Sequence, residues 1–210
     1  MVEMLAAVEA AFQRTGRGLA GWPDPHEGRA PGDAEYSRVT DPGKWRIVGA
    51  RAQAWIHALV ESGLAEVHAE TAVRWTETPG TVISRADHLL PRAAGALPLV
   101  VARSKIDDVE DAGVTLGVVE PTVVVVWIPH CGCDACDSGS QGELDELDDY
   151  MVAIVTGRFR RLSAGNQAIT VIGEGRRSTS GVQHHRDADR ILEDPTGWRE
   201  LSGTSWLERH

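Results

Sequence analysis

The feature that most constrains the fold is a series of five short strand-like segments between residues 65 and 128. In the first, AEVHAETAVRW, apolar and polar side chains alternate along residues 65–75, and one face carries Val67, Ala69, Thr71, Val73 and Trp75. Alternation with a period of two is typical of a half-buried strand in an antiparallel sheet, so we expect that face to be buried. The other four segments lie at 81–86, 97–103, 114–119 and 123–128.

The last of these segments, VVVVWI at 123–128, is apolar on both of its faces. A strand of this kind has no side that suits contact with water, so we expect it to be a central strand of the sheet. A tight turn at Glu120 and Pro121 joins it to the segment before it.

Helical periodicity marks elements outside the sheet. A short helix over residues 3–15 ends at Gly16, and a second helix has Asp41 as its N-cap and Pro42 at its first position. The second helix carries an apolar face at helical spacing, made of Trp45, Val48, Ala52, Trp55 and Leu59. The connecting residues 16–43 are rich in Gly, Pro and Asp and predict an irregular segment. We expect the rings of Trp22 and Tyr36 to hold this segment against the core.

A third helix follows Ser140, which forms a capping box with Glu143. Further along, we predict strands near 158–162 and 167–173, a short helix near 186–193 and a last strand at 198–202, with a solvated loop over 173–190. The whole pattern predicts a single α+β domain over residues 1–210, with a mainly antiparallel sheet packed with about three to four helices.

Charge and hydropathy restrict the partners and the compartment. The formal net charge of -10 would repel a phosphate backbone, so we expect no nucleic-acid partner. Glu3 and Glu9 interrupt the N-terminal apolar residues, so a signal peptide's apolar segment is missing. No stretch approaches the roughly 18 apolar residues of a membrane span. We therefore expect a cytoplasmic protein without membrane association, whose acidic charge suits a basic protein partner.

The chain's three cysteines all stand within WIPHCGCDACDSGS, residues 127–140. Cys131, Cys133 and Cys136 form C-x-C-x-x-C, and the C-x-x-C half has the spacing at which one turn directs two thiolates at a tetrahedral metal. Gly132 lets the backbone bend so that Cys131 can join them. Cytoplasmic thiols stay reduced, so clustered cysteines indicate a metal site, with zinc as the expected cofactor. The alternatives are a redox-active C-x-x-C pair, an iron–sulfur cluster, or small buried residues without a ligand.

Zinc takes four ligands, so the three cysteines leave one position to be filled. His130 is adjacent, although its place directly before a coordinating cysteine makes the geometry awkward. The other candidates are Asp134 and Asp137 in the loop, the remote His88, His184 and His185, and water. A protein ligand would make the site structural, whereas water would allow Lewis-acid chemistry or generate hydroxide.

Three functions fit these observations. The first is a binding or regulatory module whose metal organises the loop, and the second is a metal-dependent hydrolase with an open zinc position. The third is a metal-free acidic interaction protein, suggested by the seven acidic residues between Asp134 and Asp149. The sequence contains no G-x-S-x-G elbow and no H-E-x-x-H motif, so it leaves open whether the protein is an enzyme.

Several stretches of the chain resemble a bacterial family catalogued as a domain of unknown function. They are DPGKWRIVGARAQAW, GALPLVVARSKIDDVEDAGVTLG, WIPHCGCDACDSGSQGELDELD and VTGRFRRL, and the resemblance covers roughly residues 41–162. The block CGCDACDSGS is its most specific part. The resemblance implies that an acidic residue is more usual at the position of His130, which counts against this histidine as a ligand. It implies no particular activity.

Overall fold

The computed structural model describes residues 1–70, 72–173, 175–182 and 185–208. The chain divides into two compact units, each of which is built from two stretches of sequence. The first unit comprises Met1–Pro91 and Pro98–Asp148, and the second comprises Arg92–Leu97 and Asp149–His210. The predicted α+β class with antiparallel sheets is confirmed. That residues 1–210 form a single domain stays a prediction.

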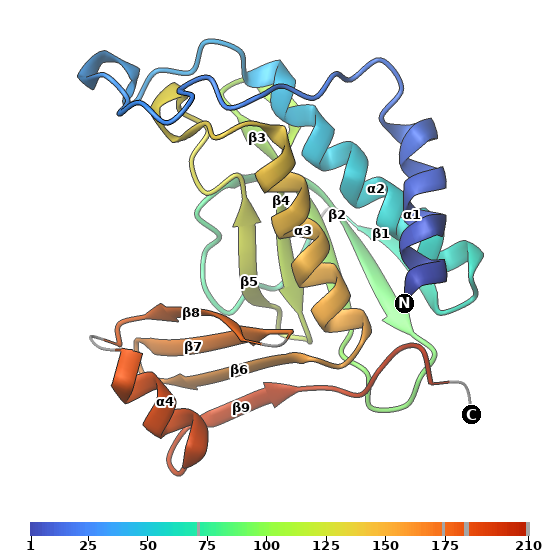
Figure 1. The fold of residues 1–210 in the computed structure, drawn as a ribbon. Coiled ribbons are helices and arrows are strands. Elements are labelled where there is room, and N and C mark those ends of the chain that lie inside the picture. Colours follow the sequence, from blue (N-terminus) through green and yellow to red (C-terminus); the bar gives the residue numbers. More distant parts are fainter. Residues whose placement is uncertain (71, 174, 183–184, 209–210) are drawn as a thin grey trace. The chain divides into compact units, whose positions relative to one another are not determined.

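The first unit contains a five-stranded sheet in which every strand pairs antiparallel with its sequence neighbour (Figure 1). Its strands, in spatial order, are β1 (Ala65–Glu70), β2 (Val82–Pro91), β3 (Leu99–Ile106), β4 (Val109–Val118) and β5 (Val123–Ile128). The bounds of β5 are those predicted, whereas β2 continues five residues beyond the expected end at Ala86.

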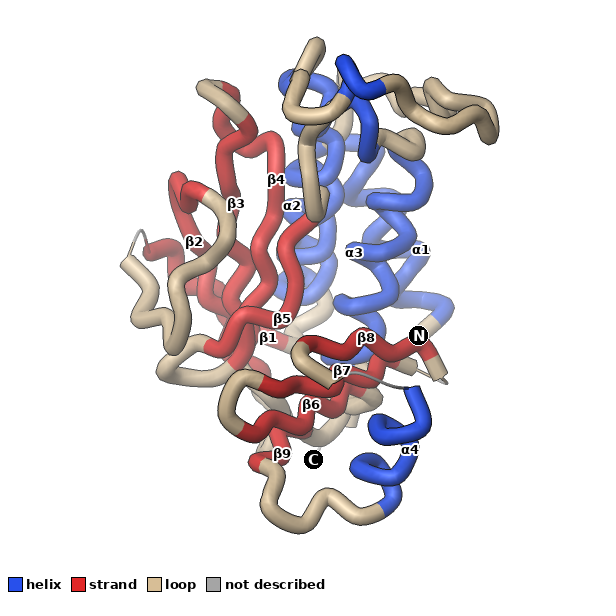
Figure 2. The backbone as a smooth tube through the Cα atoms, turned by 90° about the vertical axis from the view of Figure 1, so that its left-hand side faces the viewer, coloured by secondary structure: helices blue, strands red, loops and turns tan. Residues whose placement is uncertain are grey.

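Helices cover one face of this sheet (Figure 2). They are α1 (Val2–Thr15), α2 (Arg46–Glu61) and α3 (Ser140–Val155), of which α3 belongs to the first unit as far as Asp148. A 3₁₀ turn, η2 (Pro42–Trp45), leads into α2, and the Asp41 carboxylate caps it by accepting the backbone N–H groups of Gly43 and Lys44. The predicted apolar face of α2 is confirmed, because Trp45, Val48, Ala52, Trp55 and Leu59 are each 0% exposed.

The opposite face of the sheet is covered by the segment between β1 and β2. Val73 and Trp75 pack there against Ala86, Val100 and Ala102, and Trp75 forms an isolated bridge with Thr122. This covering explains an error in the prediction for β5, which is an edge strand and not a central one. Its two faces are apolar because helices lie over one face and the 72–81 segment lies over the other.

The prediction that the first strand buries the face carrying Val67 and Ala69 was wrong. β1 ends at Glu70, and Val67 is 40% exposed while Ala69 is also exposed. Val67 pairs with Leu89 and lies on the helix-covered side of the sheet, whereas Trp75 packs against the other side. The alternation therefore does not belong to one continuous strand, and β1 is an exposed edge.

The second unit contains a four-stranded antiparallel sheet of order β8-β7-β6-β9 and one helix. The elements are β6 (Phe159–Ala164), β7 (Gln167–Ile172), β8 (Arg176–Ser180), α4 (His185–Glu193) and β9 (Arg199–Ser202). Leu162, Ile169 and Ala188 form its buried centre. The predicted strands and helix of this region are confirmed, but β8 was missed inside the 173–190 stretch that was expected to be a loop.

None of the helices in the described part of the chain has the length and apolar character needed to cross a membrane.

Candidate metal centre

The three cysteines lie on the loop that connects β5 to α3. A short 3₁₀ turn, η3 (Asp134–Cys136), forms the middle of this loop. Gly132 packs so tightly that a Cβ there would come within 2.9 Å of the Ile106 side chain. Gly139 has a φ of +89°, and a Cβ on it would come within 2.8 Å of the Asp24 backbone nitrogen. Close packing at both glycines therefore fixes the path of the loop.

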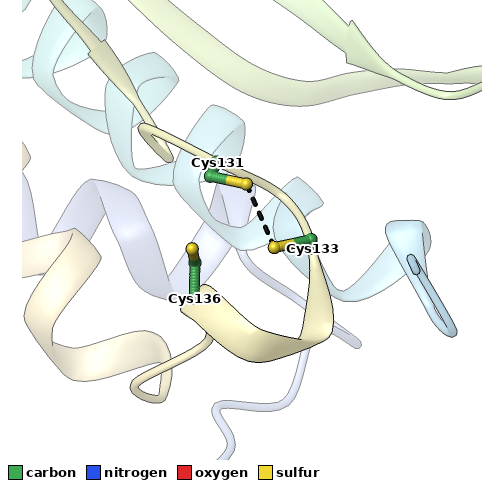
Figure 3. A group of neighbouring side chains, drawn as sticks. All are labelled: Cys131, Cys133 and Cys136. Atoms are coloured by element: carbon green, nitrogen blue, oxygen red, sulfur yellow. Dashed lines mark hydrogen bonds between the residues drawn. The ribbon is translucent and has the colours of Figure 1, made fainter. Parts of the chain in front are cut away.

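The sulfur atoms of Cys131, Cys133 and Cys136 converge. All three Sγ atoms lie within 4.8 Å of one another, and those of Cys131 and Cys133 are 3.2 Å apart. Figure 3 shows the three side chains pointing toward one another from the two arms of the loop. A tetrahedral zinc ion with Zn–S bonds of about 2.3 Å separates its sulfurs by about 3.8 Å. The observed spacing is thus close to what a single ion requires.

The three thiols differ in environment, and none is in a disulfide. Cys133 is buried, whereas Cys131 and Cys136 are exposed, so an ion can reach the sulfurs from solvent. Burial alone would raise the pKa of the Cys133 thiol, but hydrogen bonds from Cys131, from Cys136 and from the backbone of Ser37 outweigh it and lower that pKa to about 7. The hydrogen bond to Cys133, together with burial, raises the pKa of Cys136 to about 12. Donors aimed at the Cys133 sulfur favour its thiolate, the form that binds metals.

The two aspartates of the loop are occupied by other contacts. The Asp134 carboxylate accepts hydrogen bonds from Arg38 Nε at 2.7 Å, from the Thr40 backbone nitrogen at 2.9 Å and from the Thr40 hydroxyl. The Asp137 carboxylate accepts from Trp22 Nε1 at 2.8 Å and pairs with Lys44. Neither aspartate belongs to the group of converging ligand atoms. Both act as anchors for a distant part of the chain.

That distant part is residues 22–44, which we call the strap. Figure 1 shows this N-terminal segment running beside the cysteine loop. Besides the aspartate contacts, His26 Nε2 lies 3.0 Å from the Asp134 carbonyl oxygen, and the Asp134 N–H donates to the Arg38 carbonyl at 2.7 Å. The Trp22 ring also packs edge-on against Trp45, with centroids 5.2 Å apart. The strap therefore holds the loop from outside through side chains and backbone together.

Of the two rings expected to hold the irregular segment, only Trp22 does so. Tyr36 is 56% exposed, so that part of the prediction was wrong. The contact between strap and loop was not foreseen as such. One sequence signal does point to it. The loop contains two aspartates, although the metal needs only one further ligand, so at least one aspartate must have another role.

The predicted histidine ligands do not join the sulfurs within the described part of the chain. His130 has a side chain that is 61% exposed, and its Nε2 lies 3.3 Å from a Glu146 carboxylate oxygen. His88 lies on β2 and is not among the converging ligand atoms. His184 is outside the described residues, and of His185 only the backbone, at the start of α4, is described. The assignment of His130 as a ligand stays a prediction.

A family model matches residues 8–210, which is nearly the whole chain. The chain belongs to a family of unknown function, DUF6226. The match extends well beyond the resembling region 41–162, and it includes both the strap and the cysteine loop. Comparison with curated proteins and with solved structures found no match.

In this DUF6226 chain the first turn of α3 differs from the predicted capping box. The Ser140 hydroxyl accepts a hydrogen bond from the Trp22 backbone N–H at 3.0 Å and so helps to hold the strap in place. Glu143 is left partly buried, and its Oε2 has no hydrogen-bond partner in the described structure. Burial, followed by the neighbouring charge of Glu146, raises the pKa of the Glu143 carboxyl to about 7. A carboxyl with this property was not predicted from the sequence.

The acidic run after the cysteines is mostly engaged inside the protein. Asp148 accepts from Trp55 Nε1 at 2.7 Å and pairs with Arg51 at 2.7 Å. Asp149 pairs with Arg176 at 2.5 Å, and Asp145 accepts from Gln141 at 2.8 Å. Four of these carboxylates, Asp134, Asp137, Asp148 and Asp149, are therefore each paired with a cation of the same chain.

Proposed function

We propose that this chain is a metal-binding module in which Cys131, Cys133 and Cys136 hold one zinc ion. The observation that carries the proposal is the convergence of the three sulfurs within 4.8 Å on a loop that is packed and hydrogen-bonded on its outer side. Three thiolates suit zinc, which accepts sulfur ligands in tetrahedral sites. A reducing compartment such as the cytoplasm would keep these thiols available for the metal.

The charge of the ligand set favours a binding or regulatory role. Three thiolates more than neutralise a divalent ion, so they weaken its power to polarise a substrate or to acidify a bound water. The fourth ligand would be His130, one of the remote histidines, water or a group supplied by a binding partner. We expect a soft donor such as a thiolate to suit this position best.

The metal would act on the strap through the loop. The anchors of the strap, Asp134 and Asp137, stand directly after Cys133 and Cys136 in the sequence. Holding the two sulfurs on one ion fixes the backbone that carries these carboxylates. Metal occupancy would in this way decide whether residues 22–44 are held against the loop, which provides a basis for regulation by metal or by thiol oxidation.

The first test is elemental analysis of untagged protein that has been purified without metal columns, together with a thiol titration. We expect about one zinc per chain, with the three thiols protected until a chelator is added. The Cys133→Ser variant should lose the zinc. The matched control Ser138→Ala, an exposed position of the same loop, should retain it, and so should Asp137→Asn if that aspartate is an anchor and not a ligand. Metal-free protein with three freely reacting thiols would contradict the proposal.

A metal-dependent hydrolase is the second candidate, and Glu143 is the observation in its favour. Its carboxyl has a pKa near neutrality and interacts electrostatically with His130 and Asp137, which flank the cysteines. A carboxyl of this kind could act as a general base beside an open metal position. Zinc-dependent hydrolysis of a model ester that is lost in Glu143→Gln, while zinc is retained, would favour this candidate over the binding module.

A further inference from the structure

A second candidate site lies away from the cysteines, in a cavity of about 510 Å³ within the first unit. The cavity is bounded by the end of α1, by the first half of α2 and by strands β2, β3 and β4. Its charged lining consists of three arginines, Arg46, Arg85 and Arg103, and two acidic residues, Glu110 and Asp111. Its volume falls within the range of small-molecule pockets, about 300–1,000 Å³.

Arg103 is unusual because its guanidinium is buried in the sheet. It lies on β3, and its side chain is 1% exposed. It donates to Gln53 Oε1 at 3.0 Å and, at the long distance of 3.5 Å, to the Val101 carbonyl oxygen. A guanidinium carries five N–H donors, so much of its hydrogen-bonding capacity is unused.

The acidic group nearest to Arg103 does not complete its hydrogen bonding. Asp87 Oδ2 is 3.9 Å from the guanidinium, and this oxygen has no hydrogen-bond partner in the described structure. A buried charge normally needs close, hydrogen-bonded partners to offset the loss of water. Burial, together with the charge of Arg85, lowers the pKa of Arg103 to about 10, so the group is still a cation at neutral pH.

The other two arginines add positive charge that is only partly balanced. Arg85 stands opposite Arg103 in the register of β2 and β3, an arrangement that repels like charges, and it pairs with Asp111 at 3.2 Å. Arg46 Nε donates to the Glu110 carbonyl oxygen at 3.2 Å, and no carboxylate partner of Arg46 is found in the described structure. The Glu110 carboxylate is instead paired with Lys105 at 2.8 Å.

We propose that this cavity binds a small molecule through an oxyanion, either a carboxylate or a phosphate group. Arg103 forms the floor of the site, where its buried positive charge attracts the anion, and the exposed Arg46 contributes a second guanidinium that the anion can reach. The planar fork of arginine matches carboxylate and phosphate oxygens in pairs, which supports this ligand class over a halide or a neutral compound. The bound anion would supply the counter-charge that Asp87 provides only at a distance.

Titration calorimetry on the full chain tests the proposal with two probes, inorganic phosphate and succinate, at constant ionic strength. We expect at least one of them to bind in the millimolar range or tighter, and the one that binds identifies the type of oxyanion. Arg46→Gln, at an exposed position, should weaken binding about tenfold, and Arg103→Met should abolish it. The control Arg14→Gln removes an exposed arginine outside the cavity and should change nothing.

A further variant separates this site from the cysteine loop. Cys133→Ser should bind the probe as the unchanged protein does, because the cavity contains no cysteine. Should Arg103→Met fail to fold, as judged by circular dichroism, the difference in probe affinity between Arg46→Gln and Arg14→Gln still tests whether the cavity binds the anion. Absence of binding for both probes, or equal affinities in those two variants, would overturn the proposal. Loss of binding in Cys133→Ser would overturn it as well, because the anion would then belong to the metal centre.

Discussion

The Asp137 carboxylate is buried in the cysteine loop and is satisfied by donors from three directions. Its side chain is 1% exposed. The carboxylate accepts hydrogen bonds from Trp22 Nε1 and from the Gly139 backbone N–H, and it forms an ion pair with Lys44. Although burial opposes ionisation, these donors, led by Lys44, lower the pKa of the Asp137 carboxyl. Its contribution to stability is therefore present at neutral pH and is lost as the pH falls through that lowered pKa. An aspartate with this environment stabilises the loop without needing to bind a metal.

The Glu143 carboxyl, unlike that of Asp137, has a buried oxygen without a hydrogen-bond partner, and burial raises its pKa. This leads to a prediction about the pH dependence of stability. The pKa of Glu143 is about 7 in the folded chain and 4.5 as an ordinary carboxyl, so the folded state binds the additional proton between these two values. Stability should therefore fall as the pH rises from about 4.5 to 7. Glu143→Gln, which resembles the protonated acid, should remove this fall and stabilise the protein at pH 8 by about 2–3 kcal/mol. Urea unfolding at a series of pH values measures it.

The control for Glu143 is Asp145→Asn, an exposed carboxyl on the same helix. This variant should follow the pH dependence of the unchanged protein. If the Glu143→Gln curve runs parallel to the curve of the unchanged protein over pH 5–8, the carboxyl does not retain its proton in the folded state.

At the level of elements, the sequence predicts best where one physical cause decides the outcome. The α2 helix was predicted from its apolar face, which is observed, and from an Asp41 cap, which instead caps the 3₁₀ turn η2 that leads into the helix. β5 has the predicted bounds, but its place at the sheet edge depends on the 72–81 segment, which covers it from far away in the sequence. β8, with mostly exposed polar residues, carries no apolar signal and was missed.

The candidate site likewise has a part that the sequence predicts and a part that it does not. Local spacing was enough to bring together Cys131, Cys133 and Cys136, which the structure confirms as a converging group. The strap could not be predicted, because its contacts join residues separated by about a hundred positions and no local pattern encodes such a pairing. The burial of Glu143 depends on the same tertiary contacts.

The strap and the cysteine loop should respond together to removal of the metal, a prediction that rests on the proposed zinc site. The Thr40 N–H donates to Asp134 Oδ1 at 2.9 Å, and the Asp134 N–H donates to the Arg38 carbonyl. Both amides should exchange hydrogen at least about tenfold faster after chelation, because the loop backbone is then less constrained. Hydrogen-exchange mass spectrometry measures this, with the β3–β4 hairpin as the internal control. Unchanged exchange in residues 22–44 would separate the strap from the metal.

At the scale of the whole molecule, the chain passes between its two compact units more than once. Residues 92–97 belong to the second unit, where the Thr204 N–H donates to the Gly95 carbonyl at 3.1 Å. Helix α3 contributes residues to both units, since the division falls after Asp148. Neither unit is one continuous stretch, so truncation is a poor way to study either of them. Point substitutions within each core are better suited.

The cysteine loop, the strap and the arginine-lined cavity all come from the first unit. A core substitution in the second unit, Leu162→Ala, should therefore lower stability by about 2–5 kcal/mol and leave both ligand sites intact in the folded protein. The matched comparison is Leu116→Ala, which removes an equally buried leucine from the first unit, where both ligand sites lie. Zinc content and anion affinity, measured on folded protein at low temperature, check this. Zinc lost from folded Leu162→Ala would show that the metal centre depends on the core of the second unit, and it would contradict this prediction.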